Sequence, residues 1–111
     1  SGGHGALDAH SDLYSLGATL YYALTGRPPF DARDPRVILK KVVKRRPQDP
    51  CSLNEQIPQR VADICLKLLE KKPTDRYPSA RALELDLERV LRSQARSMIG
   101  RLLRFGRSTE E

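Results

Sequence analysis

Two histidines and two cysteines are the side chains of this 111-residue chain best suited to bind a metal ion. His4 and His10 lie near the N-terminus without a matching set of further ligands. Cys51 and Cys65 form no Cys-x-x-Cys pair and no Cys/His cluster. Zinc sites need about four such ligands at characteristic spacings. We therefore expect no metal site.

The two cysteines are better explained as free thiols. Cys65 falls on the apolar face of a predicted helix, which favours a buried and inert thiol, and Cys51 follows Pro50 in a predicted loop. Two unpaired cysteines suit a reducing compartment. Neither a signal peptide nor an apolar run of bilayer-spanning length occurs. We expect a cytoplasmic location.

Basic side chains exceed acidic ones, with 20 Lys and Arg against 14 Asp and Glu, a net charge of +6 and a pI of about 9.7. This balance suits nucleic acid, anionic lipid or an acidic partner, and it equally suits solvated helix faces. We expect no nucleic-acid binding, because the basic residues are spread over several helices without a set of stacking aromatics. The candidates for docking an acidic partner or substrate are Lys40, Lys41 and Lys44.

The elements that must position these residues are helical throughout. Residues 11–25 repeat leucines at spacings of three and four, and Gly26 with the following Arg-Pro-Pro ends that helix. Other faces of this helix are also apolar, so we predict that it runs through a core. The repeating leucines are Leu13, Leu16, Leu20 and Leu24.

Three further helices have recognisable starts. Asp34 is a predicted N-cap with Pro35 at the first helical position, and this helix extends to Arg46. Residues 48–56 are predicted to be a loop, and the next helix begins near Pro58. Ser79 is the predicted N-cap of the helix after that. No segment alternates as a strand would, so the predicted fold is all-α with four to five helices.

Residues 93–111 form a predicted basic amphipathic tail. Gly100 weakens this helix by about 1 kcal/mol relative to Ala, and Gly106 is predicted to end it. The apolar side can pack back onto the domain, enter a partner's groove or lie on an anionic membrane. The tail residues that would make such contacts are Arg96, Met98, Ile99, Arg101, Leu102, Leu103 and Arg104.

Two segments carry a resemblance to a known family. Residues 11–30, SDLYSLGATLYYALTGRPPF, resemble the long central helix and following turn in the C-terminal lobe of bacterial-type Ser/Thr protein kinases. Residues 68–80, LLEKKPTDRYPSA, resemble a later segment of that lobe with the pattern Pro-x-x-Arg-x-x-Ser-Ala. Order and spacing agree over roughly residues 8–92. The resemblance implies that the helices correspond to the later helices of the lobe.

The resemblance also implies roles for three residues. Asp12 matches an Asp that hydrogen-bonds the backbone of the catalytic loop, and Arg76 matches an Arg that pairs with a Glu at the end of the activation segment. Gly17 matches a position where the helix approaches its neighbours closely. The Gly-rich loop, the strand Lys and the catalytic and metal-binding Asp motifs of kinases do not occur here. ATP and magnesium therefore belong to a complete parent, and this chain alone has no expected catalytic, cofactor or metal residue.

We thus divide the chain into a flexible lead at residues 1–10, a partial kinase lobe at 11–92 and the tail at 93–111. The segments that cover the central helix in the family are missing, so an apolar face of residues 13–24 should lack cover and drive association. The expected partner is the remainder of a kinase domain with its protein substrates, or a second copy in a homodimer. The alternative function is a naturally truncated, kinase-like binding or dimerisation module.

Overall fold

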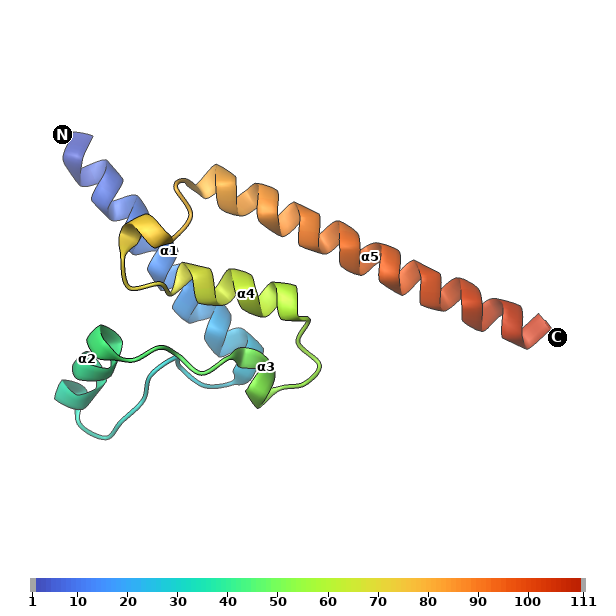
Figure 1. Ribbon diagram of the computed structural model, residues 1–111, viewed down its shortest axis with the longest axis horizontal. Helices are drawn as coiled ribbons and strands as arrows, with labels where there is room; N and C mark the ends of the chain where they lie inside the picture. The colour runs from blue at the N-terminus through green and yellow to red at the C-terminus, as the bar shows by residue number, and fades with distance from the viewer. Residues whose placement is uncertain (1, 111) are drawn as a thin grey trace.

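In the computed structural model, the backbone is described for residues 2–110 and the side chains for residues 11–104. Within these limits the chain contains helices and one 3-10 turn but no strand, which confirms the predicted all-α class (Figure 1). In chain order the elements are α1 (Gly2–Thr25), α2 (Pro35–Lys44), α3 (Pro50–Leu53), α4 (Gln59–Leu68), η1 (Pro73–Asp75) and α5 (Ala80–Glu110).

The predicted helix boundaries with a specific cap are confirmed. Asp34 accepts a hydrogen bond from the backbone N–H of Arg36 at 2.9 Å, which satisfies one of the open donors at the start of α2. Ser79 accepts from the N–H of Ala82 at 3.1 Å ahead of α5. Gly26 has a φ of 75°, the left-handed conformation that ends α1 and that glycine adopts without a steric penalty.

Helices α1 and α4 cross at an unusually close contact. Gly17 of α1 is buried against α4, and a Cβ built on it would lie 2.7 Å from the Cβ of Leu68 and 3.2 Å from the side chain of Leu69. The buried Cys65 thiol donates to the carbonyl of Gly17 at 3.5 Å. The absence of a side chain at residue 17 therefore sets the distance between the two helices.

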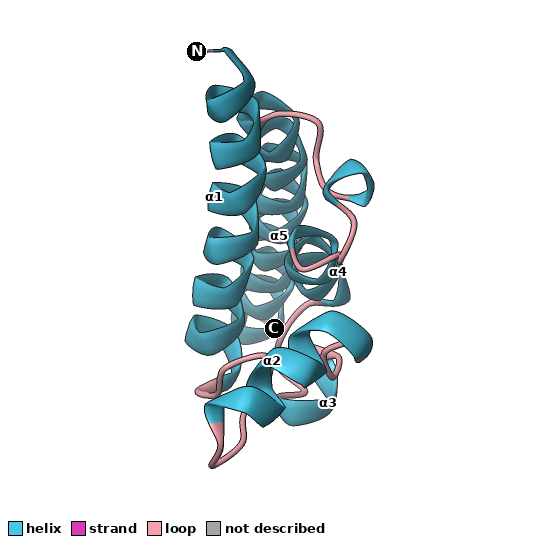
Figure 2. Ribbon diagram, turned by 90° about the vertical axis from the view of Figure 1, so that its left-hand side faces the viewer, coloured by secondary structure: helices cyan, strands magenta, loops and turns pink. Residues whose placement is uncertain are grey.

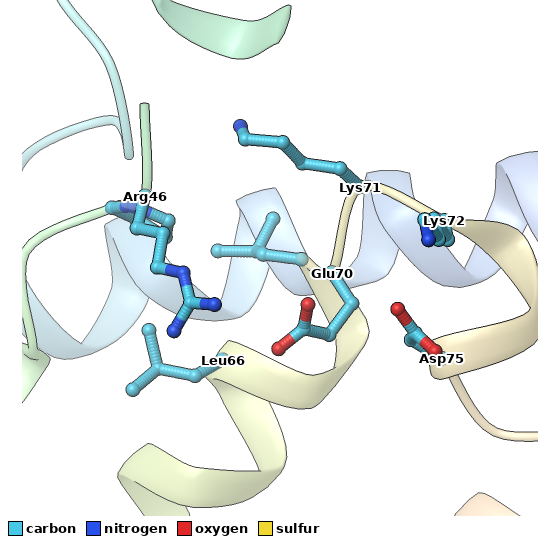
Figure 3. Close-up of a pocket in the computed structure, with 8 residues that line it drawn as sticks. Arg46, Leu66, Glu70, Lys71, Lys72 and Asp75 are labelled. Carbon is cyan, nitrogen blue, oxygen red and sulfur yellow. The ribbon is translucent and has the colours of Figure 1, made fainter. Parts of the chain in front are cut away.

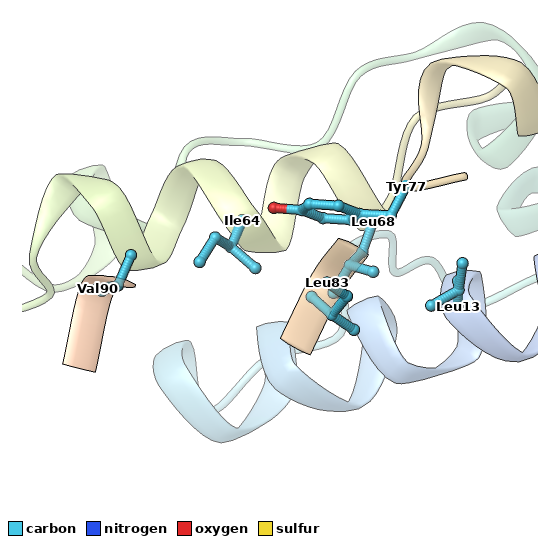
Figure 4. Close-up of a cluster of buried hydrophobic side chains, with 6 residues drawn as sticks. All are labelled: Leu13, Ile64, Leu68, Tyr77, Leu83 and Val90. Carbon is cyan, nitrogen blue, oxygen red and sulfur yellow. The ribbon is translucent and has the colours of Figure 1, made fainter. Parts of the chain in front are cut away.

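The core is built around this crossing. Its main cluster joins α1, α4, the segment after η1 and the first half of α5 (Figure 4), and comprises Leu13, Ile64, Leu68, Tyr77, Leu83 and Val90. A second cluster, Tyr21, Cys65 and Leu69, lies toward α3. The Tyr21 hydroxyl donates to the carbonyl of Gln48 at 2.7 Å and so fixes the chain between α2 and α3.

The prediction that residues 11–25 run enclosed through a core is wrong. The helix is continuous, but only the face that carries Leu13, Gly17 and Tyr21 is buried. Leu16 remains 45% exposed and Tyr22 59% exposed. The other helices pack along one side of α1, because the close approach at Gly17 selects that side. The expected uncovered apolar face is therefore present.

Several boundaries differ from the prediction, among them the end of α2, which lies at Lys44 and not at Arg46. Helix α1 begins at Gly2, ahead of the predicted start at residue 11, and the short α3 lies inside the predicted loop 48–56. Helix α5 passes through Gly100 and Gly106 and ends at Glu110, with no break near residue 93. Extending an existing helix adds one hydrogen bond per residue, which offsets the modest cost of a glycine.

The long α5 gives the molecule an elongated shape. Its extents are 62 × 37 × 16 Å and its radius of gyration is 17.7 Å, whereas a compact domain of this length has about 13 Å. Figure 1 shows α5 continuing beyond α4, while α3 lies at the C-terminal end of α1. Figure 2 gives a second view of the same arrangement. Within the described part of the chain, no helix combines the length and hydropathy needed to cross a membrane.

Gly17→Ala should destabilise the fold by about 1–2 kcal/mol, although Ala is the better helix former, because overpacking against the Cβ of Leu68 outweighs the propensity gain. Gly100→Ala is the matched control, since its new Cβ would meet only the Arg104 side chain at 3.8 Å. Urea unfolding followed by circular dichroism should show a lower midpoint for the first variant and no loss for the second. Equal midpoints would contradict the close-contact interpretation.

Candidate functional site

A cleft that could accept an anion lies where α1, α2 and the connection between α4 and α5 meet. Its volume is about 490 Å³, and its lining offers three hydroxyls and two cations but no carboxylate. A positive, hydroxyl-rich cleft favours a negatively charged group. The lining residues are Ser11, Tyr14, Ser15, Val42, Val43, Lys71 and Arg76.

Arg76 is the most firmly positioned cation of this cleft. Its Nε donates to the carbonyl of Glu70 at 2.7 Å and its Nη2 donates to the carbonyl of Lys71 at 3.3 Å. Its guanidinium carbon lies 5.0 Å from the centroid of the Tyr14 ring, within cation–π range. The planar guanidinium therefore joins the end of α4 to α1 in a fixed orientation.

Tyr14 and Lys71 complete the positive cleft, and the sequence analysis singled out neither. Burial raises the pKa of Tyr14, which the charge of Arg76 partly opposes, so the phenol stays neutral near pH 7. Lys71 donates to the carbonyl of Val42 at 2.6 Å and lies 5.2 Å from the Phe30 ring centroid, and burial lowers its pKa. These contacts join residues distant in sequence, so no local spacing indicates them.

The three family positions do not gather in one site. Asp12 is exposed in the interior of α1 and, among the described residues, makes no hydrogen bond or ion pair. Gly17 lies on the buried face of α1, where a Cβ would meet the Cβ of Leu68 at 2.7 Å. Arg76 lines the cleft. Asp12 therefore presents its carboxylate away from the core, on the uncovered face.

A second cleft, of about 380 Å³, lies between the segment after α2 and the end of α4. Figure 3 shows the side chains of Arg46 and Glu70 both extending into it. Its lining mixes three cations with two carboxylates and contains no Ser, Thr, Cys or His. We assign it no chemistry. The lining is Arg46, Pro47, Leu66, Leu69, Glu70, Lys71, Lys72 and Asp75.

The predicted docking lysines have different surroundings. Lys41 donates to the carbonyl of Asp31 at 2.7 Å and thereby holds the loop before α2. Lys40 and Lys44 are exposed. Of the three predicted docking lysines, Lys40 and Lys44 are therefore the two whose side chains remain open to an acidic partner.

The tail residues are exposed along the described part of α5. The side chains of Met98, Ile99, Leu102 and Leu103 are all more than half exposed, so the alternative that they pack back onto this domain is wrong. Arg96, Arg101 and Arg104 are exposed with them. Helix α5 leaves the body before these residues, and nothing in the described chain covers them.

The cysteines behave as predicted, whereas the histidines cannot be placed. Cys65 is buried and its burial raises the thiol pKa to about 11, so it is unreactive at neutral pH. Cys51 is half-buried in α3, and both thiols are free. The side chains of His4 and His10 lie outside the described residues.

The relatives that comparisons with known proteins find are named as kinases, two of them serine/threonine-protein kinases and one a hybrid histidine kinase. The chain is 40% identical over 87 residues to the serine/threonine-protein kinase PksC of Streptomyces coelicolor, which is 78% of this chain and 16% of that protein. It is 38% identical over 89 residues to PknB of Mycolicibacterium smegmatis, 80% of this chain and 14% of that protein. It is 43% identical over 82 residues to the hybrid signal transduction histidine kinase G of Dictyostelium discoideum, 74% of this chain and 2% of that protein.

These matches cover most of this chain but only a small part of each relative. The chain spans about one sixth or less of the length of these curated relatives. No protein-family model matches it. The similarity is therefore to one segment of each larger protein, in agreement with the motifs at residues 11–30 and 68–80.

Arg76→Lys should lower the free energy of unfolding by about 1–2 kcal/mol, because Lys cannot reproduce the two carbonyl contacts together with the stack on Tyr14. Arg81→Lys is the control, since Arg81 makes only an exposed ion pair with Glu84 whose loss costs about 0.5 kcal/mol or less. Urea unfolding measures both. Equal small effects would show that Arg76 does not fix the α4–α5 connection.

Proposed function

We propose, on the premise that this chain is homologous to a segment of bacterial serine/threonine-protein kinases, that it forms the C-terminal helical portion of a kinase catalytic domain. The complete parent would transfer the γ-phosphate of ATP, with magnesium, to protein Ser and Thr hydroxyls. This portion would contribute no catalytic residue. Its role would be to hold the catalytic loop and the activation segment in position.

The uncovered face of α1 is the observation that carries this proposal. Helical periodicity places Asp12 and Tyr22 on the side opposite the buried line of residues 13, 17 and 21, with Leu16 on the flank next to Asp12. A carboxylate that accepts backbone N–H bonds fixes a loop strongly, because its charge strengthens those hydrogen bonds. Exposed apolar side chains beside it favour a packed partner. Both features suit a loop and helix from the preceding part of a kinase lobe.

The positive cleft lined by Tyr14, Lys71 and Arg76 would make a second contact with the rest of the same parent kinase domain. Its lining places the oriented guanidinium of Arg76 beside Lys71 and three hydroxyls, and the resemblance implies that this Arg pairs with a Glu of the activation segment. The exposed Lys40 and Lys44 would then face acidic protein substrates. We expect the parent to work in the cytoplasm, because both cysteines are free thiols.

A chimera tests the proposal. Residues 11–92 of this chain replace the homologous segment of the Streptomyces kinase PksC, and autophosphorylation is measured with ATP and magnesium. We expect an active chimera. In it, Asp12→Asn should lower the rate by about a hundredfold through misplacement of the catalytic loop, whereas the exposed Asp31→Asn control should leave the rate unchanged. A folded but inactive chimera would contradict the proposal, and an unaffected Asp12→Asn rate would remove the role of Asp12.

The alternative is a kinase-like module that acts by self-association. The exposure of Leu16 and Tyr22 favours it, because two copies could bury this face against each other about a two-fold axis. The same face cannot serve a kinase lobe and a second copy at once. The oligomeric state therefore separates the two functions.

If the alternative holds, light scattering at tens of micromolar should give the mass of a dimer, and Leu16→Gln should shift it to monomer. Leu39→Gln on α2 is the matched control, since Leu39 is also exposed but lies on another helix. A monomer at all concentrations rules out the dimer. A dimer that survives Leu16→Gln would assign the contact to a different face.

A further inference from the structure

The second half of α5 is not built to continue the packing of the first half. In the first half, Leu83, Leu87 and Val90 face the core. At helical spacing the same line continues through Gln94, Ser97 and Arg101, all polar. The core-facing side of α5 therefore ends at Val90.

A new apolar stripe begins at that point on another side of the helix. It runs through Leu91, Ala95, Met98 and Leu102 at spacings of four, three and four, with Ile99 and Leu103 beside it. The five larger side chains are more than half exposed. An ordered apolar stripe of this kind needs an external surface to cover it.

The charges around the stripe indicate what that surface is. Residues 89–104 contain five arginines and no Asp or Glu. At 100° per residue, Arg92 and Arg96 border one edge of the stripe and Arg101 borders the other. The opposite side carries Ser93, Ser97 and Gly100 together with the remaining two arginines, Arg89 and Arg104. An apolar stripe bordered by arginines on both edges is typical of helices that lie in a membrane interface.

We propose that residues 89–104 bind the surface of a bilayer that contains anionic phospholipids, with the helix lying in the interface. The stripe would enter the boundary of the acyl chains, and the arginine stems would extend outward to the phosphates. This segment is about 24 Å long and projects from α2, α3 and α4 (Figure 1), so its whole stripe can meet a flat surface. The inference does not depend on the proposed kinase role.

A second copy is the less suitable occupant. Pairing two such helices would bring two sets of five arginines together with no acidic residue in either segment, and like charges destabilise such a pair. The only ion pair that reaches this segment joins Arg92 to Glu88 at a loose 3.9 Å, among the described residues. An anionic bilayer instead attracts each arginine.

Sedimentation of the full chain with lipid vesicles tests the proposal. We expect binding to phosphatidylcholine vesicles that contain phosphatidylserine, none to pure phosphatidylcholine, and loss of binding at high salt because the attraction is screened. No binding to the phosphatidylserine vesicles at low salt overturns the proposal. If the chain binds both kinds of vesicle, and salt does not change that binding, the proposed role of the arginines is overturned.

Two pairs of variants assign the binding to this helix. Arg96→Gln with Arg101→Gln should weaken it by about tenfold or more, whereas Arg33→Gln with Arg60→Gln, which removes the same charge from exposed positions outside α5, should not. Leu102→Ser should weaken it by about tenfold. Leu39→Ser is its control, because Leu39 is 66% exposed and Leu102 is 64% exposed.

Alternative occupants give different results. Circular dichroism should show unchanged helicity in these exposed-site variants, so that lost binding reports contact and not unfolding. A dimer in light scattering that Leu102→Ser dissociates, without vesicle binding, would assign the stripe to a second copy and overturn the proposal. Soluble polyglutamate that binds as tightly as the vesicles would assign it to an acidic protein and overturn it equally.

Discussion

The contact between α1 and α4 at Gly17 is the constraint on which the rest of the fold depends. A side chain there would meet the Cβ of Leu68, so only glycine lets the helices approach this closely. The approach puts Leu13 and Tyr21 on the covered side and buries the Cys65 thiol against the carbonyl of Gly17. Once that side is chosen, the opposite side of α1 has no other element of the described chain to cover it.

The contact at Gly17 leaves two surfaces uncovered, and the proposed function rests on them. The uncovered side of α1 presents a carboxylate among apolar side chains, and the neighbouring cleft presents the oriented guanidinium of Arg76. Both are suited to hold other backbone in place. Both arrangements support the proposed function, in which the helical body would hold the catalytic loop and the activation segment of a kinase domain.

The sequence predicted the helices and their caps well, because Asp34, Ser79 and Gly26 act through contacts within a few residues. It also indicated Gly17 and Arg76 through the family motifs. The sequence did not predict features that depend on contacts between distant segments. The stack of Arg76 on Tyr14 and the anchoring of α2 by Lys71 join distant segments. The leucine spacing in α1 likewise marked Leu16 as core, whereas the position of α4 left it exposed.

The most direct test of the central claim is a map of backbone NMR shifts in this chain when the separately prepared preceding part of the PksC kinase domain is added. The account predicts shifts at Asp12, Leu16 and Tyr22 on the uncovered side of α1, and little change at Leu13, Gly17 and Tyr21, which α4 and its neighbours already cover. Unchanged resonances on the uncovered side at saturating concentrations, or changes confined to the second half of α5, would contradict it.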